Sequence, residues 1–169
     1  AYLYEAKILP DGQLTGIYRS GNHFKTYWEG KRSDSIELKS LGDPLGLTIM
    51  NNDEVFKLAL SDTKGNRIDI SQGTFAGKPK ILQIMGTWCP NCKDETAFLL
   101  GYLKDNPDPG FEILGVSFER HTDTTKAIAA IETYKTKMQI PYPIVYGGTN
   151  DKKKAGEVFP MLNKVVAYP

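Results

Sequence analysis

Short alternating runs of apolar and polar residues occupy the first part of the chain, residues 1–50. Three of these runs predict strands, separated by turn residues such as Gly, Pro and Asn: Tyr2–Ile8, Leu14–Tyr18 and Phe24–Trp28. Four aromatic side chains lie among them: Tyr18, Phe24, Tyr27 and Trp28. We expect these rings to pack a thin sheet, with a platform for a ligand such as a sugar as the alternative. The pattern therefore predicts a small, partial β domain over residues 1–50.

From residue 51 to residue 169 the pattern changes to strands that alternate with helices. The predicted strands are Val55–Leu60, Arg67–Ile70, Lys80–Met85, Phe111–Phe118, Pro141–Tyr146 and Lys164–Tyr168. The predicted helices are Pro90–Lys104, Thr122–Met138 and Asp151–Phe159. The strand before the first helix is apolar apart from Gln83, as expected for a strand that is covered on both faces. This alternation indicates βαβ units, a largely parallel sheet and an α/β domain.

Composition excludes several classes of protein. The charges of the 21 basic and 20 acidic residues nearly cancel, so the chain has no strong positive electrostatic field that would attract nucleic acid or an anionic membrane. The sequence has no run of 18 apolar residues and no signal peptide, and it begins without methionine, which we expect of a processed or trimmed protein. Two cysteines are too few for a disulfide scaffold.

Those two cysteines, Cys89 and Cys92, stand where a buried strand turns into a helix. At a helix start, unpaired N–H groups and the positive end of the helix dipole favour a thiolate at Cys89. Cys92 lies one turn further in, within reach of Cys89. The spacing therefore predicts a pair in which Cys89 attacks a partner disulfide and Cys92 then releases the reduced partner.

Two other interpretations of a single Cys-x-x-Cys motif are weaker. A structural zinc site takes four ligands, and the only additional soft ligands are His23 and His121, which stand alone and far from the cysteines. We therefore expect no metal and no other cofactor. The second is a redox domain that has lost its activity and serves only for binding. Such a domain would more often have lost one of its cysteines.

The segment Gly86-Thr87-Trp88-Cys89-Pro90-Asn91-Cys92-Lys93-Asp94-Glu95 resembles the active site of TlpA-like thioredoxin-fold thiol-disulfide oxidoreductases, within the broader AhpC/TSA–thioredoxin superfamily. The resemblance runs from about residue 53 to the end of the chain. It implies a thioredoxin-like domain over residues 51–169, with a central mixed sheet flanked by helices. Because the sequence ends at Pro169, we expect the C-terminal hairpin and helix of that fold to be missing.

The resemblance also implies roles for individual residues near the motif. Cys89 is expected to be the nucleophile and Cys92 the resolving thiol. Glu95 matches a glutamate that assists proton transfer at Cys92 in such proteins; the alternative is an acid that favours the helix dipole. Gln83 occupies the position of a buried aspartate in cytosolic thioredoxins, so that route for protons is absent.

Three further residues are expected to contact the substrate. By the resemblance, Trp88 shields the cysteine pair from water, and Pro90 stiffens the turn between the cysteines. Pro169 matches the cis-proline that binds the substrate backbone in the family. We therefore expect a cis bond between Tyr168 and Pro169 in the intact protein.

The resemblance implies an enzyme of the bacterial cell envelope, periplasmic or membrane-anchored, that reduces disulfides of exported proteins. Its partners would be protein thiols and disulfides and a membrane-bound electron donor. The alternatives are a non-catalytic binding module of the envelope and a peroxiredoxin-like peroxidase. The peroxidase ranks lower because peroxiredoxins place a threonine three residues before the attacking cysteine, where this chain has Gly86.

Overall fold

The computed structural model describes residues 2–20, 24–32, 46–51, 56–166 and 168. The chain divides into two compact units, Ala1–Gly42 and Asp43–Pro169, and each is described here by itself. No helix in the described part of the chain is long and apolar enough to cross a membrane.

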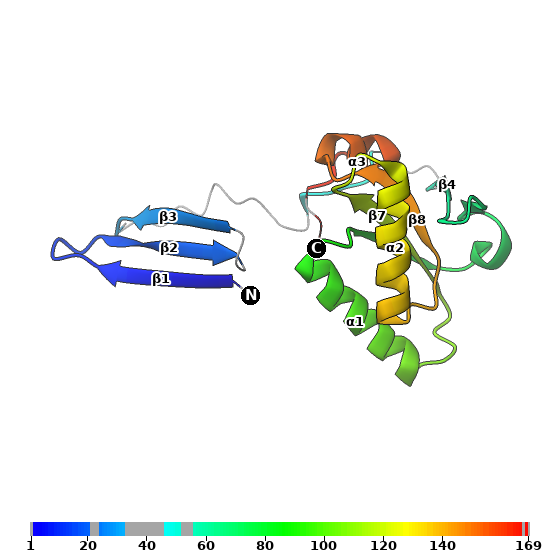
Figure 1. Cartoon of the computed structure of the whole chain (residues 1–169), viewed down its shortest axis with the longest axis horizontal. Coiled ribbons are helices and arrows are strands. Elements are labelled where there is room, and N and C mark those ends of the chain that lie inside the picture. Colours follow the sequence, from blue (N-terminus) through cyan, green and yellow to red (C-terminus); the bar gives the residue numbers. More distant parts are fainter. Residues whose placement is uncertain (1, 21–23, 33–45, 52–55, 167, 169) are drawn as a thin grey trace. The chain divides into compact units, whose positions relative to one another are not determined.

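The first unit is an antiparallel sheet of three strands in the order β1-β2-β3 (Figure 1). Its strands are β1 (Tyr2–Ile8), β2 (Leu14–Ser20) and β3 (Phe24–Gly30). The three strands predicted from the sequence are therefore confirmed, and the second and third extend two residues beyond their predicted ends.

The aromatic residues of this sheet do not all share one face. Tyr18 contacts Phe24 with ring centroids 6.1 Å apart, and Tyr4 lies 4.6 Å from Tyr18 on the neighbouring strand. Tyr27 is adjacent in sequence to Trp28, so strand alternation places it on the opposite face, where Lys25 lies over its ring. Tyr18, Phe24 and Tyr4 therefore pack together on one face of the sheet, and Tyr27 packs with Lys25 on the other.

The second unit is built on a parallel sheet of order β6-β7-β8. The strands are β6 (Lys80–Met85), β7 (Glu112–Glu119) and β8 (Ile144–Thr149). A short antiparallel hairpin, β4 (Ala59–Ser61) with β5 (Arg67–Asp69), adjoins β8 through an antiparallel bridge between Asp62 and Val145. The helices are α1 (Pro90–Asp105), α2 (Thr124–Met138) and α3 (Lys152–Val158), and Gly73–Phe75 forms a 3₁₀ turn. The predicted α/β class, with a mixed sheet flanked by helices, is confirmed.

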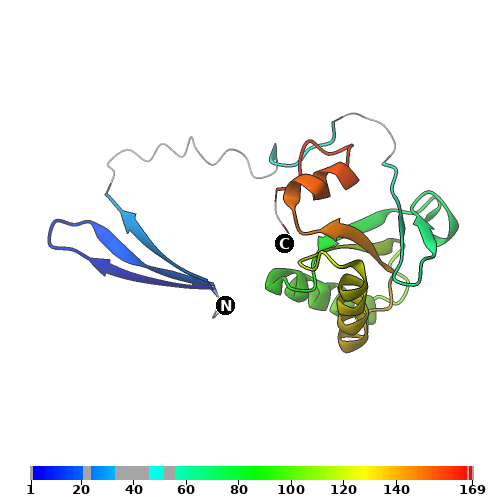
Figure 2. The same ribbon diagram turned by 45° about the horizontal axis from the view of Figure 1, so that its top comes forward.

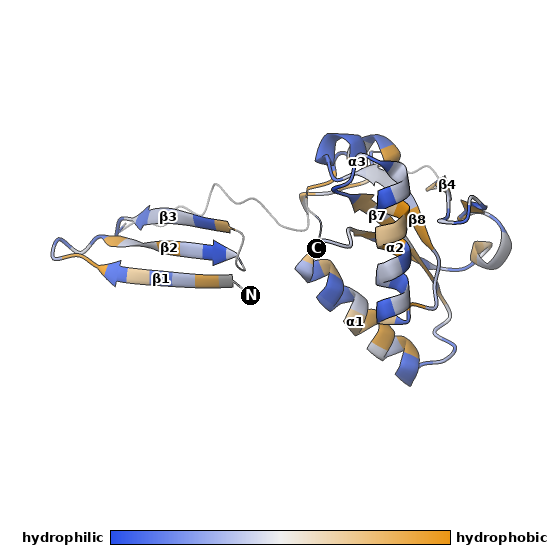
Figure 3. Ribbon diagram, in the orientation of Figure 1, coloured by the Kyte–Doolittle hydropathy of each residue, from blue (hydrophilic) through white to orange (hydrophobic). Residues whose placement is uncertain are grey.

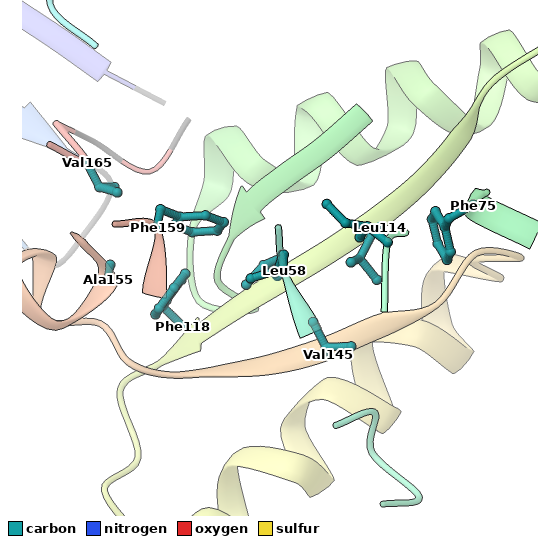
Figure 4. Close-up of a cluster of buried hydrophobic side chains, with 10 residues drawn as sticks. Leu58, Phe75, Leu114, Phe118, Val145, Ala155, Phe159 and Val165 are labelled. Atoms are coloured by element: carbon teal, nitrogen blue, oxygen red, sulfur yellow. The ribbon is translucent and has the colours of Figure 1, made fainter. Parts of the chain in front are cut away.

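Strand β7 lies in the middle of the sheet and is buried along almost its whole length. On one face, Phe118 packs against Phe159 at the end of α3, with ring centroids 6.2 Å apart, and Leu114 belongs to the same buried cluster (Figure 4). On the other face, Ile113 packs with Leu99 of α1 and Ile131 of α2. Figure 2 shows α1 and α2 on one side of the sheet and α3 on the other. Hydrophilic residues line α3 and much of α2, as expected for helices that cover a sheet (Figure 3).

Most element boundaries follow the hydrophobic pattern, and three predicted strands need correction. The strand expected at Val55–Leu60 is Ala59–Ser61, and residues 52–55 lie outside the described residues. The strand expected at Pro141–Tyr146 begins only at Ile144, because the two prolines that precede it have no N–H for a ladder.

The third correction concerns Lys164–Tyr168, where residues 164–166 and 168 belong to no strand. Backbone pairing ends before residue 164. Leu162 forms an isolated β-bridge with Met50, and the side chain of Asn51 donates to the carbonyls of Pro160 and Leu162. The chain after α3 is therefore held by residues that precede the hairpin rather than by the edge of the main sheet.

Candidate active site

Cys89 is the N-cap residue of α1, directly after the loop that leaves β6. Its backbone is extended, with φ −94° and ψ 116°, and its Sγ accepts a hydrogen bond from the N–H of Cys92 at 3.2 Å. Pro90 follows in the first turn, where its missing N–H leaves no helical bond unmade. The site therefore places a sulfur atom where a helix leaves N–H groups without carbonyl partners.

Cys89 and Cys92 form a disulfide in this structure, with Cα atoms 5.3 Å apart. Cys92 is fully buried and Cys89 is 6% exposed. The pair belongs to the apolar cluster that includes Met85, Leu99 and Ile131. Cys89 is thus the more exposed residue of the two, which agrees with the order of attack and resolution that the sequence predicts.

The loop before Cys89 is fixed by a buried glutamate. Glu119, at the end of β7 and 1% exposed, accepts hydrogen bonds from the N–H of Thr87 at 3.0 Å and from its hydroxyl at 2.7 Å. The hydroxyl of Ser117 donates to the same carboxylate at 2.6 Å. Sequence reasoning missed Glu119, although an acidic residue that ends an apolar run was a signal for it.

Trp88 lies half-buried between the loop and the chain end. Its indole N–H donates to the carbonyl of Phe118 at 2.9 Å, and the guanidinium of Arg120 lies 4.5 Å from the ring centroid. The ring of Tyr168 meets it edge-on at 5.6 Å. Pro169, predicted to bind substrate through a cis bond, lies outside the described residues, but its neighbour Tyr168 does reach the site.

Gly86 occupies a position that a larger residue cannot share. A Cβ atom there would lie 2.5 Å from the indole nitrogen of Trp88 and 2.7 Å from the carbonyl oxygen of Phe118. The threonine that peroxiredoxins place three residues before their attacking cysteine would therefore clash with the backbone of β7. The glycine is explained by packing, and it disfavours the peroxidase alternative.

A polar cluster lies beneath the cysteines, on the side of α1 that faces the sheet. Gln83 is 3% exposed, and its side-chain N–H groups donate to Glu95 Oε2 at 2.9 Å and to Thr96 Oγ1 at 3.1 Å. The hydroxyl of Thr96 donates to the carbonyl of Cys92 at 2.8 Å. The structure thus links Glu95, Gln83 and the backbone of Cys92.

Two tyrosines complete this cluster. Tyr142 donates to Gln83 Oε1 at 3.2 Å, and Tyr134 donates to Thr96 Oγ1 at 3.0 Å. Burial raises the pKa of the Tyr142 hydroxyl to about 12, and burial also raises the pKa of Tyr134. Both hydroxyls therefore keep their protons at neutral pH and act as donors.

The two histidines were considered only as additional ligands for a zinc site. His121 is exposed, and His23 lies outside the described residues. In the described part of the chain, no group of three or more His, Cys, Asp or Glu side chains is placed to hold a metal ion.

Residues 52–166, most of the chain, match the AhpC/TSA family. The chain belongs to that family. The family expected from the Trp-Cys-x-x-Cys segment is thereby confirmed, and the match covers both the cysteine pair and the central sheet.

Among curated proteins, the chain is similar to the thiol-disulfide oxidoreductase ResA of Bacillus subtilis (strain 168), with 25% identity over 122 residues. The alignment covers 72% of this chain and 64% of ResA, so the chain spans less than two thirds of that relative.

Solved structures support the same fold. The thioredoxin domain of a thiol-disulfide oxidoreductase from Bacteroides vulgatus matches with a TM-score of 0.50 and 24% identity, over 67% of this chain and 72% of that one. A thioredoxin-family thiol:disulfide interchange protein from Chlorobium tepidum TLS matches with a TM-score of 0.51 and 17% identity, over 68% of this chain and 72% of that one. These similarities establish a thioredoxin-like fold for the second unit.

Proposed function

We propose that this protein is a thiol-disulfide oxidoreductase that reduces disulfides of exported proteins through the Cys89–Cys92 pair. The observation that carries the proposal is the position of Cys89 at the N-cap of α1, with its sulfur accepting the N–H of Cys92. The name of the similar ResA protein agrees with this activity.

In the reduced protein, the helix N-terminus favours the thiolate of Cys89 over the thiol. This thiolate attacks one sulfur of a partner disulfide, and the partner's other sulfur leaves as a thiolate that takes up a proton from water. The product is a mixed disulfide between Cys89 and the partner.

Cys92 completes the reaction. It gives up its proton, attacks Cys89 Sγ and breaks the mixed disulfide, so that the partner's second sulfur leaves and is protonated. The two thiols of the protein are thereby oxidised to a disulfide, and the partner disulfide is reduced to two thiols. Glu95, three residues after Cys92 on the same face of α1, is the proposed proton acceptor.

Substrate binding is assigned to Trp88, Pro90 and Pro169. Pro90 is exposed beside the disulfide, and the half-buried ring of Trp88 borders it. Trp88 limits the access of water, and Pro169 would face the substrate backbone. A membrane-bound electron donor returns the pair to the dithiol, and the protein works in the bacterial envelope, periplasmic or membrane-anchored.

Replacement of Cys89 with serine tests the activity. The wild-type protein is expected to reduce insulin in the presence of a dithiol reductant, and the Cys89→Ser variant is expected to fall to the uncatalysed rate. Insulin reduction at the wild-type rate by this variant would favour a non-catalytic binding module. Saturable turnover of hydrogen peroxide by the wild-type protein would instead favour a peroxidase.

The direction of electron flow is tested by the reduction potential of the pair. Reference couples run from about −270 mV for thioredoxin to about −120 mV for a strong oxidant. We expect a value near the reducing end. A value near the oxidising end would indicate that the protein forms disulfides rather than reduces them.

A further inference from the structure

The buried amide of Gln83 has only one orientation that satisfies its neighbours. Glu95 in its ionised form offers only acceptors, so the nitrogen of the amide must face the carboxylate. The oxygen of the amide then faces Tyr142, whose hydroxyl donates to it. The contact between Gln83 and Glu95 is therefore an N–H donor on Oε2, and it stays a donor at any pH because an amide does not titrate.

Thr96 fixes the second N–H of the same amide. Its single hydroxyl proton goes to the carbonyl of Cys92 at 2.8 Å, so its oxygen is left to accept from Gln83 and from Tyr134. The cluster therefore directs one donor, an N–H of Gln83, to Glu95 and another, the hydroxyl of Thr96, to the backbone of Cys92. These bonds connect three elements: β6, α1 and α2, together with the segment before β8.

We infer that Gln83 is a positioning residue for Glu95: its N–H occupies Oε2, so that the proton leaving Cys92 is taken up on Oε1. The inference rests on the proposed function and adds to it a residue that sets which oxygen carries the proton. Tyr142 acts one step further away, since it holds the amide of Gln83 in this orientation.

The proton step occurs when the mixed disulfide is resolved. The thiol of Cys92 loses its proton to Oε1 of Glu95, and the resulting thiolate attacks Cys89 Sγ. The Cys89–Cys92 bond forms, the bond from Cys89 to the partner breaks, and the partner sulfur leaves as a thiolate. Glu95 then returns its proton to water or to the leaving thiolate, so no further reactant is required.

The other titratable groups that face Glu95 do not replace it. They are Tyr134 from α2 and Tyr142 from the segment before β8, while Asp94 is the neighbour of Glu95 in sequence. The two tyrosines keep their protons because burial raises their pKa, to about 12 for Tyr142. Asp94 is exposed.

The test separates attack from resolution with an aromatic disulfide, dithiobis-nitrobenzoate, whose leaving thiolate absorbs visible light. When the reduced protein is mixed with this reagent, a first equivalent of thiolate reports attack by Cys89. A second equivalent reports resolution by Cys92. The rate of each phase is measured for the wild type, Gln83→Leu, Glu95→Gln and the double variant.

We expect Glu95→Gln to slow the second phase by roughly 100-fold, a typical loss for a missing proton acceptor. Gln83→Leu is expected to slow the second phase about tenfold, as for the loss of a hydrogen bond to a charged group. The double variant should be no slower than Glu95→Gln alone, because Gln83 acts through Glu95. None of the three should change the first phase by more than about twofold, since Cys89 does not depend on Glu95.

Two results would overturn the inference. One is a second phase in Gln83→Leu at the wild-type rate. The other is a double variant whose second phase is slowed by the product of the two single-variant factors. The pH profile adds a readout that impaired folding does not reproduce. Partial unfolding exposes the buried Cys92 and speeds its reaction with the reagent, whereas a misplaced Glu95 slows the second phase alone, most at pH values where Cys92 keeps its proton.

A milder pair of variants covers the case in which Gln83→Leu does not fold. Tyr142→Phe removes the hydroxyl that donates a hydrogen bond to Gln83 Oε1, and it is expected to slow the second phase several-fold. Tyr134→Phe is the matched control: it removes a hydroxyl of the same cluster that donates to Thr96 rather than to Gln83. Equal rates in these two variants would contradict the inference. A reduced wild-type protein that releases no thiolate would instead contradict the proposed function itself.

Discussion

Two glutamates approach the cysteine motif, and their surroundings differ sharply. Glu119 is 1% exposed and accepts three hydrogen bonds, two from Thr87 and one from Ser117. Glu95 is only partly buried, and among the described residues it accepts one hydrogen bond, from Gln83. One carboxylate is saturated with donors inside the fold, and the other keeps an oxygen open.

This difference indicates different tasks. A buried carboxylate with donors on both oxygens fixes the chain that provides them, so Glu119 acts as an anchor for the loop in front of Cys89. A carboxylate with one oxygen open can take up and return a proton, which suits Glu95 to the release step. Four predictions test this contrast, in order of decreasing effect on stability.

Replacing Glu119 with alanine is expected to be the most destabilising change. The N–H of Thr87 and two hydroxyls would lose their acceptor inside the fold, at a cost of about 2–4 kcal/mol in the free energy of unfolding. Urea unfolding of the oxidised protein measures this. The control is Glu157→Ala on the exposed side of α3, with an expected change within about 0.5 kcal/mol. If Glu119→Ala and Glu157→Ala changed the free energy of unfolding equally, Glu119 would not anchor the loop.

Replacing Gly86 with alanine is expected to destabilise the same side of the site by about 1–3 kcal/mol. The added methyl group would meet the backbone carbonyl of Phe118 at 2.7 Å, and a backbone atom cannot move aside easily. Gly101→Ala in α1 is the matched control, because nothing lies within 4 Å of its added Cβ. That variant should gain roughly 0.5–1 kcal/mol from helix propensity. Thermal unfolding of both variants measures these changes. An unchanged melting temperature in Gly86→Ala would contradict the predicted clash with Phe118.

Replacing Glu95 with glutamine is expected to leave the free energy of unfolding within about 1 kcal/mol of the wild type, since it removes one partly exposed contact. The same variant should nevertheless slow the second phase of thiolate release, in which Cys92 resolves the mixed disulfide, by roughly 100-fold. A Glu95→Gln protein destabilised as strongly as Glu119→Ala would mean that both carboxylates are structural, and the contrast would then fail.

A similarly small effect on stability, with none on the release of the partner, is expected at Arg120, whose guanidinium lies over Trp88 on the surface. Arg120→Ala should cost about 0.5–1 kcal/mol, the usual range for an exposed cation–π contact, and should alter the fluorescence of Trp88. Lys126→Ala, at an exposed position of α2, provides the control. Unchanged fluorescence in Arg120→Ala would show that the contact does not form in solution.

The hydrophobic pattern was sufficient to predict the central elements around the site. β6, α1 and α2 follow from local periodicity, and the position of Cys89 at the start of α1 follows from a strand, a short turn and a proline. Alternation along β3 was also enough to separate Tyr27 from Trp28, a step that the sequence interpretation did not take.

The hydrogen bonds that support the cysteine pair were not predictable in this way. Thr87 and Glu119 are 32 residues apart, and Gln83 and Tyr142 are 59 residues apart. Such pairs meet only after three parallel strands have aligned, and no local pattern records which side chains will face each other. The strand expected at Lys164–Tyr168 failed for the same reason, because its pairing depends on contacts with distant residues.

The most direct test of the account compares the two single-cysteine variants in their reduced forms. Each is mixed with dithiobis-nitrobenzoate, and the rate of thiolate release is measured near neutral pH. The account predicts rapid release and a stable mixed disulfide on Cys89 in Cys92→Ser, and much slower release from the buried Cys92 in Cys89→Ser. If Cys89→Ser reacted as fast as Cys92→Ser, Cys89 would not be the attacking thiol, and the proposed order of steps would be wrong.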